Sequence, residues 1–232
     1  MGDRSIRFWV RLIAGFIILG LILQFALPRY FTRKVTDYLY TAVEDVDILT
    51  VSLHSFPALQ LFLGRVDRAS IYFTKLEVDD LQLAEGRLVF TDLALGKTTE
   101  GYAFISGENP YLDLEISEAA LNEYIQRQYE IPSARIDLKP GKVDLAVTIN
   151  WFGKAVDLSL QGSLVVESPT RVQFVGRAFN IEGKEIPDII WNQLEGQVKF
   201  ALDFSSLPFP LEIKQVAIGE DGLHLRGENE DI

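Results

Sequence analysis

The strongest constraint on this chain is a run of apolar residues near its N-terminus, from Phe8 to Leu27. The run reads FWVRLIAGFIILGLILQFAL, and Arg11 and Gln24 interrupt it. About 20 residues of helix rise roughly 30 Å, which is the thickness of the hydrocarbon core of a bilayer. Arg11 lies close enough to the start to reach the headgroups, and Trp9 suits the membrane interface. The run therefore predicts a helix that crosses a membrane once.

A cleaved signal peptide is the alternative, because Arg4 and Arg7 precede the run as they would in one. No A-x-A-like cleavage site follows, and Pro28 would sit badly beside a cleavage point. We therefore expect residues 1–28 to form a cytoplasmic stub and an uncleaved signal-anchor. Basic residues flank both sides of the run, but long domains cross a membrane largely regardless of charge. We expect the C-terminal domain to be extracytoplasmic, on the cell membrane.

The charge of the chain is divided unevenly along its length. The formal net charge is -11, and the first 34 residues carry +5 of it, which leaves -16 for the rest. A domain this acidic is a poor partner for nucleic acid, whose binding depends on cations at the phosphates. It also cannot bind anionic headgroups by bulk charge, so any lipid contact must be apolar and local. With no cysteine, the chain excludes disulfides and thiolate metal sites.

Residues 29–45 have the spacing of an amphipathic connecting helix. Its apolar positions recur every three or four residues, at Tyr30, Phe31, Val35, Tyr38, Leu39, Ala42 and Val43. Such a helix either packs on the core of its own domain, which we favour, or lies in the bilayer interface. Both interpretations hold the following domain close to lipid.

Residues 46–227 alternate mostly with period two, as antiparallel strands with one polar face do. Apolar residues of the clearest pair are Val143, Leu145, Val147, Ile149 and Trp151, followed by Val156, Leu158 and Leu160. Further strands are predicted at residues 46–54, 66–78, 80–84, 87–95, 112–116, 134–139, 163–167, 171–177, 197–204 and 211–218. Five glycines are expected in turns with positive φ, namely Gly64, Gly86, Gly141, Gly153 and Gly222. Residues 228–232 are expected to be an acidic disordered tail.

Two helices are predicted between the strands. Ser117 is a good N-cap for an apolar stripe that contains Leu121 and Ile125, and Pro187 begins a second helix that stops at Gly196. The fold class is therefore α+β, with an N-terminal transmembrane helix before a curved, mostly antiparallel β-sheet.

No pattern in the sequence predicts catalysis, a metal or a cofactor. The two histidines, His54 and His224, have neither metal nor triad spacing, and no phosphate-binding loop or nucleophile elbow occurs. We expect a protein that is not an enzyme. An enzyme acting on envelope glycans would need three or more carboxylates that converge in a cleft.

Three stretches together resemble the LmeA-like phospholipid-binding family of bacteria, once known only as a domain of unknown function. They are VSLHSFPALQLFLGRVDRASIYF at residues 51–73, LDLEISEAALNEYI at residues 112–125 and LPFPLEIKQVAIGEDGLHLRG at residues 207–227. Pro210 departs from the small residue expected there. The resemblance implies a tubular lipid-binding (TULIP-like) fold, in which a curved sheet wraps one or more helices and binds phospholipid. It also implies export, and it brings no catalytic residue.

The hypothesis from sequence is a membrane-anchored module that holds phospholipid or another acyl lipid in an apolar groove, in the service of the cell envelope. The predicted groove lining is Val143, Leu145, Val147, Ile149, Leu158 and Leu160, with Leu121 and Ile125 from a covering helix. Phe56 and Pro57 are candidates for its mouth. The alternative is a non-catalytic structural or interaction scaffold of the envelope with a filled core. Protein partners cannot be named from the sequence.

Overall fold

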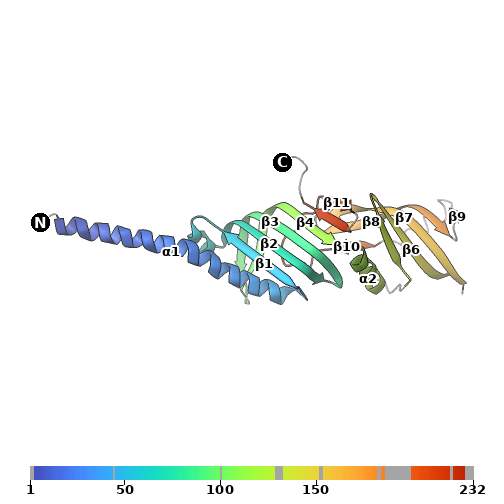
Figure 1. Cartoon of the computed structure of the whole chain (residues 1–232), viewed down its shortest axis with the longest axis horizontal. Helices are drawn as coiled ribbons and strands as arrows, with labels where there is room; N and C mark the ends of the chain where they lie inside the picture. Colours follow the sequence, from blue (N-terminus) through green and yellow to red (C-terminus); the bar gives the residue numbers. More distant parts are fainter. Residues whose placement is uncertain are drawn as a thin grey trace.

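The computed structural model describes residues 3–43, 45–99, 101–128, 133–151, 154–181, 184–185, 200–219 and 222–227. Figure 1 shows an elongated molecule, in which a long helix projects from one end and the strands follow along the same axis. The elements are α1 (Asp3–Ala42), β1 (Ile48–His54), the 3₁₀-helix η1 (Ala58–Leu63), β2 (Arg65–Val78), β3 (Leu81–Lys97), β4 (Tyr102–Ile116), α2 (Glu118–Gln128), β5 (Arg135–Lys139), β6 (Lys142–Trp151), β7 (Lys154–Ser168), β8 (Arg171–Ile181), β9 (Lys184–Glu185), β10 (Ala201–Asp203), β11 (Gln215–Ile218) and β12 (Leu223–Arg226).

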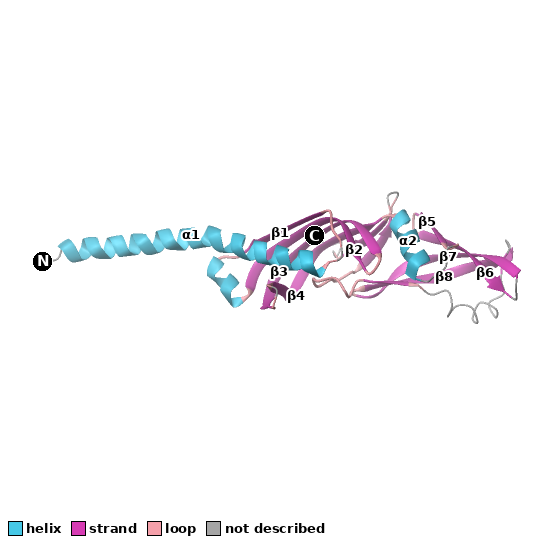
Figure 2. Ribbon diagram, turned by 90° about the horizontal axis from the view of Figure 1, so that it is seen from below, coloured by secondary structure: helices cyan, strands magenta, loops and turns pink. Residues whose placement is uncertain are grey.

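The described strands form two antiparallel sheets rather than the single curved sheet that the sequence predicts. Sheet A has the order β1-β2-β3-β4-β12-β11, and sheet B has the order β10-β8-β7-β6-β5 with β9 paired to β8. The sheets follow one another along the molecule, with α2 between them in contact with β3 and β5 (Figure 2). The chain therefore builds its length from two antiparallel units.

Helix α1 runs without interruption from Asp3 to Ala42, with Pro28 inside it. The apolar run and the amphipathic segment are thus parts of one helix. From the last residue of the run onward, Leu27, Phe31, Val35 and Leu39 are buried at spacings of four residues, and α1 contacts β1, η1 and β4. This confirms that the amphipathic part packs on the core of its own domain. Tyr30 faces away from it and is 53% exposed.

Strand β2 agrees with its predicted range to within one residue, whereas β3 is one strand where the sequence predicts two, at residues 80–84 and 87–95. Burial along β3 stops alternating at Ala84 and Glu85, between the buried residues Leu83 and Gly86. At the same level, the pairing of β2 with β3 skips Lys75, whose φ angle is 49°, and Ala84, but it keeps one register on both sides. The strand therefore continues through a break in the alternation that the sequence pattern reads as a strand end.

The glycine predictions hold in part. Gly64, Gly141 and Gly222 have positive φ angles of 71°, 71° and 150°. Gly86 is not a turn residue but lies within β3, opposite Phe73, and a Cβ there would come within 2.1 Å of the Phe73 ring. The missing side chain leaves room for that buried ring to lie across the strand. Gly153 lies outside the described residues.

Two other strand predictions differ from the structure. Residues 211–214 alternate between buried and exposed positions but are not part of a strand, and β11 begins at Gln215. Strand β12 and the first part of β4 were not predicted. The helix expected from Pro187 to Gly196 and the tail at residues 228–232 lie outside the described residues.

Helix α2 begins as predicted, with the hydroxyl of Ser117 accepting a hydrogen bond from the Ala120 backbone N–H at 3.2 Å. Its apolar stripe is buried, and a polar stripe at spacings of four residues binds the backbone of β5 and the residue before it. Asn122 accepts from the Ile136 N–H at 2.6 Å and donates to the Ile136 carbonyl at 2.8 Å. Glu118 accepts from the Leu138 N–H, and Gln126 donates to the Ala134 carbonyl. The helix thus supplies β5 with the partners that a neighbouring strand would give.

We predict that Asn122→Ala lowers the free energy of unfolding by about 1–3 kcal/mol, because it leaves both backbone groups of Ile136 without their partner. Urea denaturation followed by circular dichroism measures the change. Glu123→Ala is the matched control, since this exposed neighbour pairs with Arg127 on the helix surface. Equal losses in the two variants would contradict the role assigned to Asn122.

Candidate functional site

The structure brings most of the predicted groove lining into one place. Leu145 pairs with Leu160 and Val147 with Leu158 across strands β6 and β7. These residues, together with Val143, Leu121 and Ile125, are at most 7% exposed and belong to one core. Ile149 pairs with Val156 on the same strands, but its side chain lies outside the described residues. That these residues line a lipid groove stays a prediction.

This core is continuous along the described part of the molecule. It begins at Leu27 on α1, fills the inner face of sheet A and continues through α2 to sheet B. The segment from Phe204 to Ile213 connects the two sheets, and the Phe209 ring lies 6.2 Å from the Phe73 ring of sheet A. An apolar interior therefore extends from the end of the N-terminal run into the far sheet.

The two mouth candidates lie apart from the lining. Phe56 and Pro57 precede η1, beside α1, and Phe56 is 72% exposed. The backbone N–H of Ala58 donates to the Gln24 side chain, which ties this segment to the apolar part of α1. Their role as a mouth of the groove also stays a prediction.

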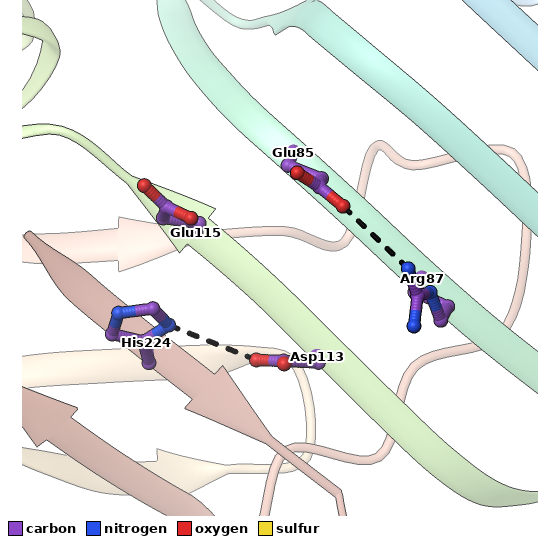
Figure 3. Close-up of a pocket in the computed structure, with 5 residues that line it drawn as sticks. All are labelled: Glu85, Arg87, Asp113, Glu115 and His224. Carbon is purple, nitrogen blue, oxygen red and sulfur yellow. Dashed lines mark ion pairs between the residues drawn. The ribbon is translucent and has the colours of Figure 1, made fainter. Parts of the chain in front are cut away.

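A small polar hollow of about 150 Å³ lies on sheet A and is lined by Glu85, Arg87, Asp113, Glu115 and His224 (Figure 3). Three carboxylates meet there, because Glu85 pairs with Glu115 and Arg87 pairs with Asp113 across β3 and β4. His224 pairs with Glu115 across β12 and β4. His224 Nδ1 lies 3.8 Å from Asp113 Oδ1. Ligand pockets usually exceed about 300 Å³, so this hollow is small for a sugar substrate. It is a ladder of charges across neighbouring strands.

A second polar hollow, of about 430 Å³, lies on sheet B among Arg135, Asp137, Lys139, Asp144, Ser159, Gln161 and Asn180. Hydrogen bonds from Lys139, at 2.6 Å, and from Gln161, at 2.8 Å, hold the pKa of Asp144 below its usual value. Hydrogen bonds to Asp144 and then to Asp137 raise the pKa of Lys139. These groups satisfy one another. No group of three or more residues suited to hold a metal ion occurs among the described residues.

The apolar run of α1 carries exposed apolar side chains, among them Phe16 at 68% and Phe25 at 65%. By length and composition, the helix from Phe8 to Ala42 is able to cross a membrane, with a mean hydropathy of 2.3 in its most apolar window. A signal sequence near the N-terminus has the same properties. The helix is therefore compatible with the predicted anchor.

A model of the LmeA-like phospholipid-binding family matches residues 22–228, from within α1 to just beyond β12. The chain belongs to this family. The match covers the buried stripe of α1 and both sheets, so the resemblance seen in three short stretches extends over the whole domain. Neither the curated proteins nor the solved structures contain a match to the chain.

Sequence reasoning missed two groups of this LmeA-like protein that lie beside the end of the apolar run. One is Gln24, which was noted only as an interruption of the apolar run. The other is the exposed apolar set around η1, namely Leu59, Phe62 and Leu63, at 54%, 62% and 77% exposed. The signal was the presence of large apolar residues in a segment too short to bury them all.

We predict that Asp144→Asn makes the stability of the protein less sensitive to acid. Because the folded state lowers the pKa of Asp144, its ionised carboxylate stabilises the fold above the unfolded pKa, and that stability is lost as the pH falls through the folded pKa. The wild type should lose this contribution below about pH 4, whereas the variant has none to lose. Urea denaturation at a series of pH values measures the slope.

Lys139→Met tests the cause, since it removes the main hydrogen bond and leaves the carboxyl of Asp144 in place. It should flatten the acid limb in the same direction as Asp144→Asn. An unchanged slope in both variants would show that this pair does not contribute to acid stability.

Proposed function

We propose that this protein is a membrane-anchored, extracytoplasmic phospholipid-binding protein that holds or presents lipid for maintenance of the cell envelope. In this proposal α1 crosses the membrane once with its N-terminus inside, and the two sheets lie outside as one lipid-binding module. The role is binding, with no catalytic step. Membership of the LmeA-like phospholipid-binding family supports the ligand class.

The observation that carries the proposal is the continuity of apolar surface along α1. The same helix exposes large apolar side chains up to Phe25 and then buries Leu27, Phe31, Val35 and Leu39 in the core of the domain. The apolar interior thus begins where the exposed apolar run ends. A lipid acyl chain leaving the leaflet beside α1 would meet that interior without crossing a polar barrier on the helix.

The energetics suit reversible exchange. Burying an acyl chain of about 16 carbons gains roughly 12 kcal/mol relative to water, at about 0.8 kcal/mol per methylene. A chain that moves from a bilayer to an apolar groove leaves one apolar environment for another, so the net change is small. Transfer in either direction then needs no nucleotide hydrolysis, in keeping with a sequence that lacks a phosphate-binding loop.

Lipid entry requires the core to open, because the described side chains of the predicted lining are at most 7% exposed. Helix α2 is fixed to β5 by the Asn122 hydrogen bonds and contacts β3 of the other sheet. We therefore expect α2 to stay with sheet B while the contact with β3 loosens. The acyl chain would take the place of side-chain contacts at the junction of the two sheets.

The low exposure of the lining also favours the alternative function, a tethered scaffold of the cell envelope. In that reading the core is filled by its own side chains, and the acidic outer faces bind a protein partner. The two functions differ in whether lipid atoms reach the inward-facing residues of sheet B.

Photolabelling of the full chain in a bilayer tests this difference. A phosphatidylcholine with a diazirine at the end of one acyl chain should label inward residues such as Leu145 and Leu160, and spare outward neighbours such as Asp144 and Ser159. Peptide mass spectrometry locates the adducts. Labels confined to α1 would count against lipid binding and support the scaffold.

A matched pair of variants makes the test specific. Leu160→Trp adds volume on the inner face and should lower labelling of sheet B, whereas Ser159→Trp adds it on the outer face and should leave labelling unchanged. Circular dichroism checks that both variants fold. Native mass spectrometry of the wild type should detect bound phospholipid, which the Leu160→Trp variant should retain less well.

A further inference from the structure

The segment of residues 55–64, here called the apolar loop, exposes four large apolar side chains at one end of sheet A. Phe56, Leu59, Phe62 and Leu63 are 72%, 54%, 62% and 77% exposed, while Ala58 and Leu61 are buried beneath them. In a 3₁₀-helix, residues three apart share a face, so η1 turns one face to the core and another outward. Scattered apolar residues are ordinary on a surface, but four together in ten residues form a patch.

The apolar loop is held in place by three other elements. Phe56 N–H donates to the Asp67 side chain of β2 at 2.7 Å, and the Leu95 N–H of β3 donates to the Gly64 carbonyl at 2.6 Å. The Phe62 ring lies edge-on to the Phe31 ring of α1, with centroids 5.7 Å apart. The patch is therefore presented by a fixed backbone, and Phe62 also joins it to the core through Phe31.

Gln24 fixes the level of the apolar loop relative to α1. Its side-chain nitrogen donates to the Ser55 carbonyl at 2.9 Å, and its side-chain oxygen accepts from the Ala58 N–H at 2.8 Å. The side-chain amide of Gln24, in the second half of the apolar run, thus binds the loop through both its nitrogen and its oxygen. Gln24 lies three residues before Leu27, so the loop joins α1 about 4.5 Å inside the end of the run.

We propose that the apolar loop enters the outer part of the leaflet from which α1 emerges, as a second and shallow membrane contact. This inference rests on the proposed span of α1, and its occupant is the lipid bilayer. The patch is continuous with the exposed apolar surface of α1 through the Gln24 contacts. Arg29 on α1 lies two residues after the apolar run, and Arg65 on β2 directly follows the apolar loop. Both are exposed, which suits the level of the headgroup phosphates.

The charge of the domain favours a contact of this kind. The chain beyond residue 34 has a net charge of -16, so its body is repelled by an anionic membrane surface. An attachment by four apolar side chains avoids that repulsion, since it acts locally and at the end of the molecule. Together with α1, the apolar loop gives the domain two points of contact, which fix its orientation relative to the membrane.

Site-specific fluorescence tests the proposal on the full chain in lipid vesicles. The chain has no cysteine, so each introduced cysteine carries the only label. Leu63→Cys probes the loop, Ile17→Cys probes the middle of the run, and Ile48→Cys is the matched control. Ile48 is an exposed apolar residue, at 53%, at the other end of β1, roughly 20 Å from the loop. An environment-sensitive nitrobenzoxadiazole label is attached at each position.

Quenching by nitroxide-labelled phospholipids then reports depth. We expect the label at Leu63 to be quenched most by a nitroxide near the carboxyl end of the acyl chain, the label at Ile17 most by one near the methyl end, and the label at Ile48 by neither. Quenching at Ile17 without quenching at Leu63 would overturn the loop proposal and leave the anchor intact. No quenching at Ile17 would instead refute the anchor.

A third outcome separates lipid from protein. If the Leu63 label shifts to the blue without being quenched by either nitroxide, a protein surface covers the loop, either a partner or a second copy of the chain. That result would also overturn the proposal. The replaced side chain is 77% exposed, so its substitution leaves the core intact.

Discussion

The structure depends on one row of four side chains, Leu27, Phe31, Val35 and Leu39, on the second half of α1. They attach a helix that is otherwise an exposed apolar rod to the core of sheet A. Each buried side chain of this size contributes about 1.5–3 kcal/mol, so the row outweighs the disruption that Pro28 causes in the helix. Because the row continues the apolar run without a loop, the part of the chain suited to lipid and the part suited to a folded core are one element.

The two sheets are joined through helix α2, which uses hydrogen bonds as well as apolar contacts. Helix α2 fills the junction with Leu121 and Ile125 and binds β5 through Glu118 and Asn122. An exposed strand edge invites pairing with another chain. Side-chain hydrogen bonds from α2 close part of this edge, so the far sheet ends in a helix rather than in an open ladder.

Much of the fold could be predicted from the sequence, because alternation with period two identifies strands wherever one face is buried. The prediction failed where a strand continues without regular alternation, and where alternation occurs outside a strand. At Ala84 and Glu85 the burial of β3 stops alternating while its pairing with β2 continues, so one strand reads as two. At residues 211–214 the alternation is present, but the backbone N–H groups of Ile213 and Lys214 donate to two different segments, at Pro169 and Arg226, so no strand ladder forms. Sheet pairing is decided by distant residues, which explains why two sheets were read as one.

The candidate site was predicted less completely than the fold. The sequence identified residues that do lie together, from Val143 to Leu160, because cross-strand neighbours on one face follow from the hairpin register. It missed Gln24, since a contact between residues 24 and 58 has no local signature, and a lone amide in an apolar run resembles a tolerated interruption. The family match supplied the ligand class that periodicity alone does not distinguish from an ordinary core.

The unbroken course of α1 from Asp3 to Ala42 has a mechanical consequence. A membrane helix adjusts its tilt when the bilayer is thicker or thinner than its apolar length. In a protein with a flexible linker that adjustment would stop at the membrane surface. In the membrane arrangement proposed above, the helix would act as a lever whose long arm is the pair of sheets, so a few degrees of rotation in the bilayer would swing sheet B sideways.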